Sequence, residues 1–193
     1  MIIDISQEIT KCNVYPGDPI PKVEKLCDMD KGDGYNLSSF SMCAHNGTHV
    51  DSPSHFIKGG KTIDMMPLES FVGECFVCCA KGDLSESDAI NILEIAKANG
   101  ADQRILIKGD AVVTPPAAKI FALNNILLLG NESQSVGPVD SPKEVHEILL
   151  SKNIVLLEGI KLGNVGEGKY FLCAQPLNIK GIEGAPCRAI LIK

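Results

Sequence analysis

Dense apolar runs separated by amphipathic segments dominate the second half of the chain. Four runs bounded by turn residues have the length of buried strands: 73–80, 104–109, 126–129 and 154–159. The segments between them favour helices, one starting at Ser87 or Asp88 and ending at Gly100, one opening at Pro115-Pro116, and one capped by Ser141. Buried strands joined by helices indicate a sheet with helical crossovers. The pattern predicts an α/β fold with a mixed central β-sheet or barrel and flanking helices.

Shorter extended segments surround this arrangement. Residues 2–5, 21–27 and 36–44 favour strands, with an Asp/Gly loop at 28–34 between the last two. Residues 170–174 and 184–192 predict two more strands, whereas the turn-rich segment 13–19 cannot continue regular structure. The chain of 193 residues shows no internal repeat, so we expect one domain spanning residues 1–193.

Composition narrows the possible partners. Hydrophobic residues make up 45% and charged residues 22% of the chain, as in ordinary globular proteins. A net charge of −6 without runs of like sign argues against nucleic-acid or anionic-membrane partners. No apolar run approaches the ~20 residues of a membrane span, and the N-terminus does not resemble a secretory signal. We therefore expect a cytoplasmic protein whose partner is a small molecule.

Eight cysteines are present, mostly inside apolar runs such as 75–80. Free cysteine behaves as a small buried hydrophobe, so a core position is the favoured interpretation. Cys75 and Cys78 form a C-x-x-C pair, but no second pair is spaced to complete a zinc site. A structural or redox role for this pair stays open.

The segment from His45 to Phe56 contains three of the four histidines of the chain. Its chemistry-bearing residues all occupy odd positions, and an extended backbone would point them to one face: His45, His49, Asp51 and His55. A helix would align the first two histidines but turn Asp51 away. We predict a short strand that presents two imidazoles and a carboxylate to one ion, with a bend after Pro53 that returns His55 to the site.

Two histidines and one carboxylate are a common set of ligands for a catalytic Zn²⁺ or Mn²⁺. Isolated histidines are more often surface or satisfied core residues. Burying four such groups without an ion would cost about 1–3 kcal/mol for each unsatisfied donor or acceptor, so we expect a divalent metal.

Glu158 is the sole charged residue of the apolar run 154–159. A buried carboxylate needs a partner, because an unpaired charge is costly in the interior. A metal ion would serve, and so would a salt bridge to Arg104 or Arg188. The residues alone leave both possibilities open.

His45, Gly47, Thr48, His49, Asp51, Pro53 and His55 match every fixed position of the motif H-x-G-T-H-x-D-x-P-x-H. The chain thereby resembles the metal-dependent cyclase-like hydrolases, the family that includes bacterial kynurenine formamidases. The resemblance implies a swivelling β/β/α-like fold, one or two divalent ions per chain, and homo-oligomers such as dimers or tetramers. It also pairs His146 with Glu158 as ligands of a second ion and places Tyr15 in the substrate pocket, where the alternative is a surface turn with Tyr15 packed on the domain.

The hypothesis for the chemistry is hydrolysis of a small amide by metal-activated water, with His55 as the proton shuttle. The resemblance implies N-formylkynurenine, an intermediate of tryptophan degradation, as the leading substrate. Three alternatives stay open: hydrolysis of another cyclic amide or lactone, a non-catalytic metal-binding or ligand-binding protein, and a thiol-redox role for Cys75 and Cys78.

Overall fold

The computed structural model describes residues 1–193 and is built on a nine-stranded sheet with the strand order β1-β13-β11-β5-β7-β9-β10-β4-β12. Four central strands are parallel neighbours: β5 (Val72–Cys79), β7 (Arg104–Lys108), β9 (Leu128–Asn131) and β10 (Val155–Glu158). The flanking strands pair antiparallel: β1 (Ile2–Asp4), β4 (His49–Asp51), β11 (Gly168–Cys173), β12 (Gly184–Pro186) and β13 (Ile190–Ile192). The predicted mixed sheet is confirmed.

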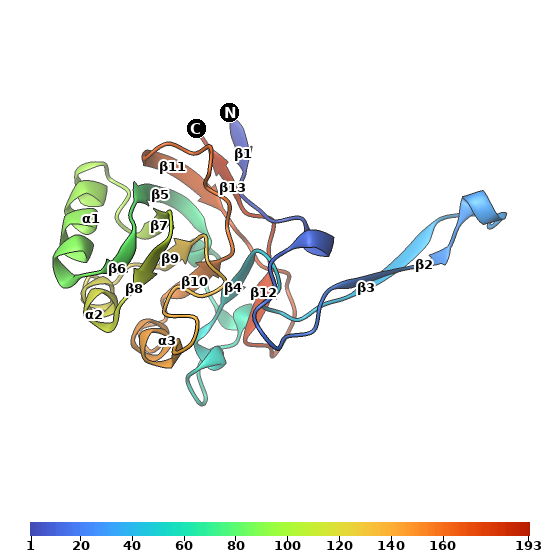
Figure 1. Cartoon of the computed structure of the whole chain (residues 1–193), viewed down its shortest axis with the longest axis horizontal. Helices are drawn as coiled ribbons and strands as arrows, with labels where there is room; N and C mark the ends of the chain where they lie inside the picture. Colours follow the sequence, from blue (N-terminus) through green and yellow to red (C-terminus); the bar gives the residue numbers. More distant parts are fainter.

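Three helices cover one face of the sheet (Figure 1): α1 (Glu86–Ala98), α2 (Pro115–Leu123) and α3 (Lys143–Leu150). Each connects two neighbouring parallel strands, as predicted for helical crossovers. Ile105 and Ile107 of β7 pack on the helical side, while Leu106 between them packs in the core of the opposite face. The central strands are therefore buried on both sides. None of the helices combines the length and the apolar character needed to cross a membrane.

The sheet curls strongly, because its two ends are joined by a very short connection. β12 is the edge strand at one end of the order, and β13 is second from the other end, yet only residues 187–189 separate them. The single strand predicted for 184–192 is therefore wrong. It is two strands, because the chain turns at 187–189 from one end of the curled sheet to the other. A separate small parallel pair, β6 (Gly82–Leu84) with β8 (Ala111–Val113), extends the body.

Two predicted helix starts are corrected. Helix α1 is capped by Ser85, whose hydroxyl accepts from the backbone N–H of Asp88 while the Asp88 carboxylate accepts from the N–H of Ser85. Helix α3 has no side-chain cap. Its cap position is Pro142, which already has helical angles, so the expected capping box of Ser141 is not formed.

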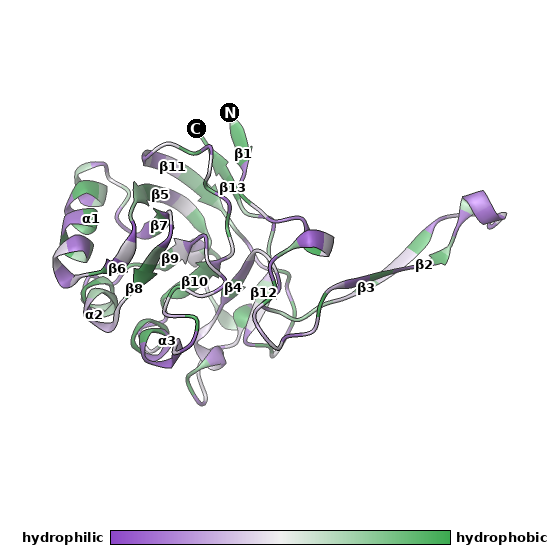
Figure 2. Cartoon of the chain, in the orientation of Figure 1, coloured by the Kyte–Doolittle hydropathy of each residue, from purple (hydrophilic) through white to green (hydrophobic).

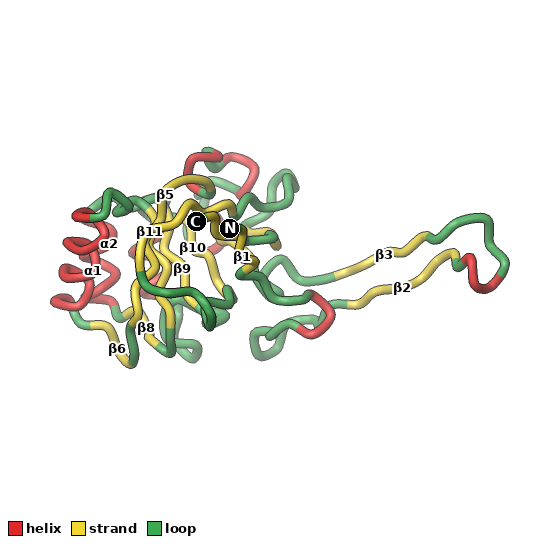
Figure 3. Tube along the Cα trace, turned by 90° about the horizontal axis from the view of Figure 1, so that it is seen from above, coloured by secondary structure: helices red, strands yellow, loops and turns green.

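A long hairpin projects from the body (Figures 1 and 3). It consists of β2 (Lys22–Cys27) and β3 (Leu37–Ser41), paired antiparallel, with a 3-10 turn at Met29–Lys31 near its tip. We call residues 19–42 the arm. Its strands agree with the extended segments predicted at 21–27 and 36–44, but nothing in the pattern indicated that they would leave the body. Further 3-10 turns lie at Ile9–Lys11, Pro53–His55, Ile63–Met65 and Leu68–Ser70.

Candidate metal centre

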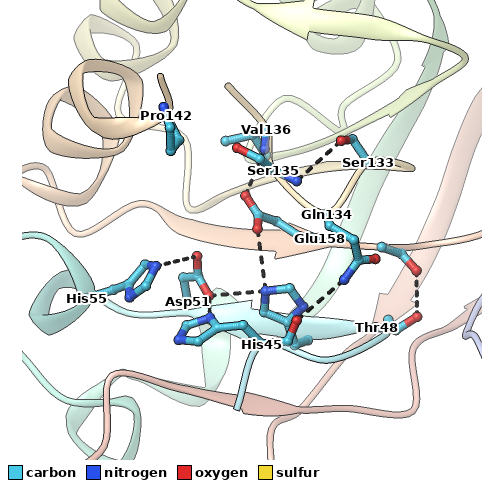
Figure 4. Close-up of polar contacts among 12 residues, drawn as sticks. His45, Thr48, Asp51, His55, Ser133, Gln134, Ser135, Val136, Pro142 and Glu158 are labelled. Carbon is cyan, nitrogen blue, oxygen red and sulfur yellow. Dashed lines mark hydrogen bonds and ion pairs between the residues drawn. The ribbon is translucent and has the colours of Figure 1, made fainter. Parts of the chain in front are cut away.

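Four of the five predicted ligands come from the elements β4, β10 and α3, which meet at one end of the sheet, and His45 comes from the turn before β4 (Figure 4). Strand β4 runs antiparallel to β10, and their register sets His49 directly opposite Glu158. His49, Asp51 and Glu158 are all buried. Helix α3 brings the buried His146 toward the same point, so residues about a hundred positions apart in sequence converge.

The predicted strand through His45 is only partly present. Residues 49–51 are extended, but residues 44–48 form a turn, in which Gly47 has a left-handed φ of +64°. The Asn46 side chain accepts from the backbone N–H of Cys43 at 2.8 Å and holds this turn. His45 therefore reaches the site through turn geometry, not through strand alternation. His55 arrives on the 3-10 turn that starts at Pro53, in agreement with the predicted bend.

The side chains approach one another at distances that an ion could bridge. His49 Nε2 lies 3.5 Å from Asp51 Oδ1 and 3.4 Å from Glu158 Oε2. His146 Nε2 lies 3.4 Å from Glu158 Oε1 and 3.8 Å from Asp51 Oδ2. His55 Nε2 is 3.9 Å from Asp51 Oδ2. The four other candidate ligands and the candidate shuttle thus surround Asp51.

Two groups have ligand atoms that all lie within 4.8 Å of one another: His49 with Asp51 and Glu158, and His45 with Asp51 and His55. This division differs from the predicted set of His45, His49 and Asp51 for the first ion. Asp51 belongs to both groups, and its carboxylate has two oxygens that could each bind a cation.

The backbone fixes the tautomer of two imidazoles. His49 Nδ1 lies 3.1 Å from the Gly47 carbonyl, and His146 Nδ1 lies 2.9 Å from the Pro142 carbonyl. A carbonyl oxygen only accepts, so each Nδ1 carries a proton, and each Nε2, which faces the carboxylates, is the ring atom left to bind an ion. This is how metal-binding histidines are oriented in proteins.

The residues fit a divalent cation. His49 Nε2 and Asp51 Oδ2 are buried without a hydrogen-bond partner. A bound cation would satisfy both atoms, because a neutral imidazole nitrogen and a carboxylate oxygen both offer electron pairs. The alternative partners for Glu158 are occupied elsewhere, because Arg104 donates to the carbonyls of Ser70 and Glu74 and Arg188 pairs with Asp4.

Charge is distributed unevenly over the cluster. Burial would raise the pKa of Asp51, but the surrounding histidines outweigh it and hold that pKa below its ordinary range. Burial would lower the pKa of His45, but Asp51 and Glu183 on its two ring nitrogens raise it to about 9. Burial lowers the pKa of His55; Asp51 opposes this and His45 adds to it. His55 is therefore the imidazole best able to be neutral near pH 7.

Comparison with known proteins places the chain in a family. The Cyclase family profile matches residues 3–137. The chain belongs to the Cyclase family. Over 98% of its length it is 32% identical to a kynurenine formamidase of Erythrobacter litoralis and 35% identical to one of Salinibacter ruber, covering 93% and 96% of those proteins.

A solved structure of a potential metal-dependent hydrolase with cyclase activity is 27% identical to the chain. It superposes with a TM-score of 0.81, covering 99% of this chain and 96% of that one. With these relatives, the chain is a hydrolase of the amidohydrolase type. Its cluster of His, Asp and Glu suits a divalent metal.

In this Cyclase-family member a pocket of about 250 Å³ opens over the cluster. Tyr15 and Phe56 line it beside the histidines, and the role of Tyr15 in substrate binding stays a prediction. The Tyr15 hydroxyl donates to the Val139 carbonyl, which ties the 13–19 turn to the loop before α3. Phe56 packs against His146, with the two ring centroids 4.6 Å apart. Phe56 was not predicted as a site residue, although its place next to His55 was a usable signal.

The two cysteines of the C-x-x-C pair point into different cores. Cys75 packs in the cluster opposite the helices and Cys78 in the cluster beneath them, as expected three residues apart on a strand. Both are free thiols, and burial raises the pKa of each to about 12. Core packing, the favoured interpretation, agrees with this arrangement.

Proposed function

We propose that this Cyclase-family hydrolase cleaves N-formylkynurenine or a closely similar aryl formamide. The observation that carries the proposal is the buried His49–Asp51–Glu158 group, with its unpartnered ring nitrogen and carboxylate oxygen, at the floor of a pocket walled by Tyr15 and Phe56. Similarity to two kynurenine formamidases supports this substrate class.

Five residues would hold the metal: His45, His49, Asp51, His146 and Glu158. When bound, a divalent ion supplies Lewis acidity, which polarises a carbonyl and makes water more acidic. Zn²⁺ is the first candidate and Mn²⁺ the second, with one or two ions per chain, because nitrogen and carboxylate ligands suit both ions.

His55 would be the proton shuttle. Its side chain is 27% exposed at the pocket, compared with 1% for His49 and 3% for His146. It stacks on His45 with ring centroids 4.1 Å apart, so it can turn one ring nitrogen toward a substrate while the stack holds its plane. In the reaction it accepts a proton from the attacking water and donates it to the leaving aryl nitrogen as the C–N bond breaks, which yields formate and an aromatic amine.

The aromatic residues would hold the aryl group. Phe56 is fixed by contacts with both His55 and His146, at ring separations of 4.5 and 4.6 Å, and it faces the pocket together with Tyr15. An aryl formamide placed between these rings would direct its formyl carbon toward the metal ligands. We extend the proposal to a homo-oligomeric, cytoplasmic enzyme, for which eight free thiols suit a reducing compartment.

The deciding experiment combines elemental analysis of the purified protein with hydrolysis rates on a panel of a formamide, a lactam and a lactone. We expect bound Zn²⁺ or Mn²⁺ and fastest release of formate from N-formylkynurenine. Fastest opening of a lactam or lactone would favour the rival hydrolase. Bound metal with no turnover on any substrate would contradict catalysis and favour a binding protein.

A further inference from the structure

A chain of amide hydrogen bonds lies behind the candidate ligand His49. The His49 ring donates from Nδ1 to the Gly47 carbonyl at 3.1 Å. The same oxygen accepts from Gln134 Nε2 at 3.0 Å (Figure 4). A carbonyl oxygen has two lone pairs, and here each has a donor. Gln134 therefore helps to set the direction of the Gly47 carbonyl, and with it the direction in which His49 Nε2 points.

The orientation of the Gln134 amide follows from its partners. Its Nε2 faces two carbonyl oxygens, those of Gly47 at 3.0 Å and His45 at 3.4 Å, and its Oε1 accepts from Gln7 Nε2 at 2.9 Å. A flipped amide would place oxygen against oxygen and nitrogen against nitrogen. Both amide hydrogens of Gln134 are thus used within the protein, although the side chain borders the pocket. The residue supports candidate ligands and has no hydrogen left to donate to a substrate.

Gln7 continues the chain of hydrogen bonds from the segment that follows β1. It is 8% exposed, and its Nε2 donates to the Gly159 carbonyl at 2.8 Å as well as to Gln134 Oε1. Its Oε1 accepts from the backbone N–H of Asn13 at 2.7 Å. Both polar atoms of this amide therefore have partners, which also decide its orientation.

The same hydrogen bonds reach Glu158, the candidate ligand that faces His49. Gly159 directly follows Glu158, and its carbonyl accepts from the Thr48 hydroxyl at 2.7 Å in addition to Gln7. Thr48 directly precedes His49, and its hydroxyl oxygen accepts from the backbone N–H of Gln7 at 2.9 Å. Gln7 therefore joins the backbone before one candidate ligand to the backbone after the other.

Gly159 is the position that lets these groups meet. Its φ of +67° lies in the left-handed region, which favours glycine. A Cβ there would lie 2.3 Å from both Gln134 Oε1 and the Gly47 oxygen, and 2.7 Å from Gln7 Nε2. Any side chain at this position would push the two amides and the carbonyl apart. We call Gln7, Gln134 and Gly159 the clamp.

We propose that the clamp directs His49 Nε2 toward a bound ion, with Gln134 and Gln7 as positioning residues. The inference rests on His49 being a metal ligand, as in the proposed function. Groups that orient metal-binding histidines commonly change metal affinity 10–100-fold when they are removed. A purely structural role would instead stabilise the metal-free fold and leave metal affinity unchanged.

The test measures the Kd for Zn²⁺ by titration calorimetry in wild type and variants. Gln134→Met keeps the length of the side chain but removes its donor and acceptor. Gln134→Glu keeps the shape and an acceptor for Gln7, but sets a carboxylate oxygen against the Gly47 carbonyl. We expect each variant to raise the Kd about tenfold or more. Gln103→Met, at an exposed glutamine, is the matched control and should leave the Kd unchanged.

A double variant separates the contributions of the two glutamines. Gln7 acts on the Gly47 carbonyl through Gln134, so Gln7→Met should raise the Kd by a smaller factor than Gln134→Met. Once Gln134 is lost, Gln7 has no route to that carbonyl. The double variant should therefore raise the Kd by less than the product of the two single factors. Factors that multiply in full would overturn the role given to Gln7.

Thermal unfolding of the metal-free proteins separates positioning from stability. We expect every variant to unfold cooperatively within a few degrees of wild type, because each lost hydrogen bond contributes only about 0.5–1.5 kcal/mol. A lower unfolding temperature together with wild-type affinity for Zn²⁺ in Gln134→Met would make the amide structural only and overturn the proposal.

Failure of the clamp and failure of the proposed function give different results. A wild type that binds Zn²⁺ but does not hydrolyse N-formylkynurenine removes only the function, and the clamp stands if the variants bind Zn²⁺ more weakly. A wild type that binds no divalent metal removes the candidate centre and overturns the clamp with it. In an active enzyme, the turnover of Gln134→Met should recover when the Zn²⁺ concentration exceeds the raised Kd.

Discussion

The sheet body and the arm use similar strand sequences for opposite purposes. In the body, Ile105, Leu106 and Ile107 alternate between two cores and are fully buried. In the arm, Val23 and Phe40 face each other across a strand pair and are more than half exposed. The body buries its apolar side chains within one chain, whereas the arm leaves its own exposed to solvent. Five buried side-chain atoms of the body have no hydrogen-bond partner, and two of them are the candidate ligand atoms His49 Nε2 and Asp51 Oδ2.

The candidate metal centre and the arm differ in what each leaves without a partner. A cation would complete the candidate metal centre, and the groups that would bind it lie on β4, β10 and α3 and on the turns beside β4. The arm, whose strands β2 and β3 carry apolar segments (green in Figure 2), instead leaves large apolar side chains exposed, among them Val23 and Phe40. Changes in the first region should therefore alter metal binding and chemistry, and changes in the second should leave both unchanged.

The largest effect should come from Asp51→Asn. Asp51 is common to both candidate ligand groups, and an amide keeps the shape but loses the charge and one acceptor oxygen. We expect metal to be lost on dialysis and formamide turnover to fall by about 10³-fold or more. Elemental analysis and a formate assay measure both. Asp33→Asn, at the arm tip, is the matched control and should leave both unchanged; full metal content in Asp51→Asn would show that Asp51 is not a ligand.

His55→Ala should divide binding from chemistry within the body. His55 reaches the pocket, whereas His146 is buried against Glu158. We expect His55→Ala to keep its metal while turnover falls about 10²–10⁴-fold, the usual contribution of a general acid or base. His146→Ala should lose metal as well as activity. Loss of metal from His55→Ala would make His55 a ligand of the His45 and Asp51 group.

Much of the body could be predicted because its signals are local. The apolar runs at 104–109 and 154–159 fall on β7 and β10, and a lone charge in the second run pointed to Glu158. The odd spacing of His45, His49, Asp51 and His55 indicated convergence, although only part of that segment is a strand. A turn around Gly47, and not a continuous strand, brings these side chains together. The spacing therefore predicted the cluster correctly but the backbone conformation incorrectly.

The remaining features depend on contacts between distant segments. Val23 and Phe40 read as ordinary strand residues, because alternation along a strand does not reveal whether a body lies beside it. Gln134 lies in a polar loop, and its importance arises from Gly47, which is 87 positions away. The cap of α1 is Ser85 and not the predicted Ser87 or Asp88, because several neighbouring residues can cap a helix and tertiary packing selects among them.

The free energy of unfolding should fall for Leu157→Ala in the body and stay nearly unchanged for Phe40→Ala in the arm. Leu157 is fully buried in β10, so its truncation should lower the free energy of unfolding by about 2–5 kcal/mol. Phe40 is 64% exposed, so its truncation should change the body transition by no more than about 0.5 kcal/mol. Urea unfolding measures both. A large loss for Phe40→Ala would mean that the arm folds with the body.

A smaller effect than that of Leu157→Ala should appear when a capping residue is removed from the body, and none when one is removed from the arm. Ser85 caps α1 in the body, and Asp28 caps the 3-10 turn of the arm by accepting from Asp30 N–H at 3.0 Å. Ser85→Ala should lower the free energy of unfolding by about 1 kcal/mol in urea, because α1 packs on the core. Asp28→Ala should leave the body transition unchanged, because the arm unfolds separately.

The Ser85 effect should also depend on pH. Hydrogen bonds from Ser85 lower the pKa of the Asp88 carboxyl below its ordinary 3.8. A carboxyl whose pKa is lower in the folded state adds stability above its unfolded pKa and loses it as pH falls through the folded value. The difference between wild type and Ser85→Ala should therefore be full near pH 7 and shrink below about pH 3.8. A difference that stays constant down to pH 3 would show that the Ser85 hydroxyl acts on the helix without Asp88.

A body transition that responds to Asp28→Ala would show that the arm and the body fold as one unit.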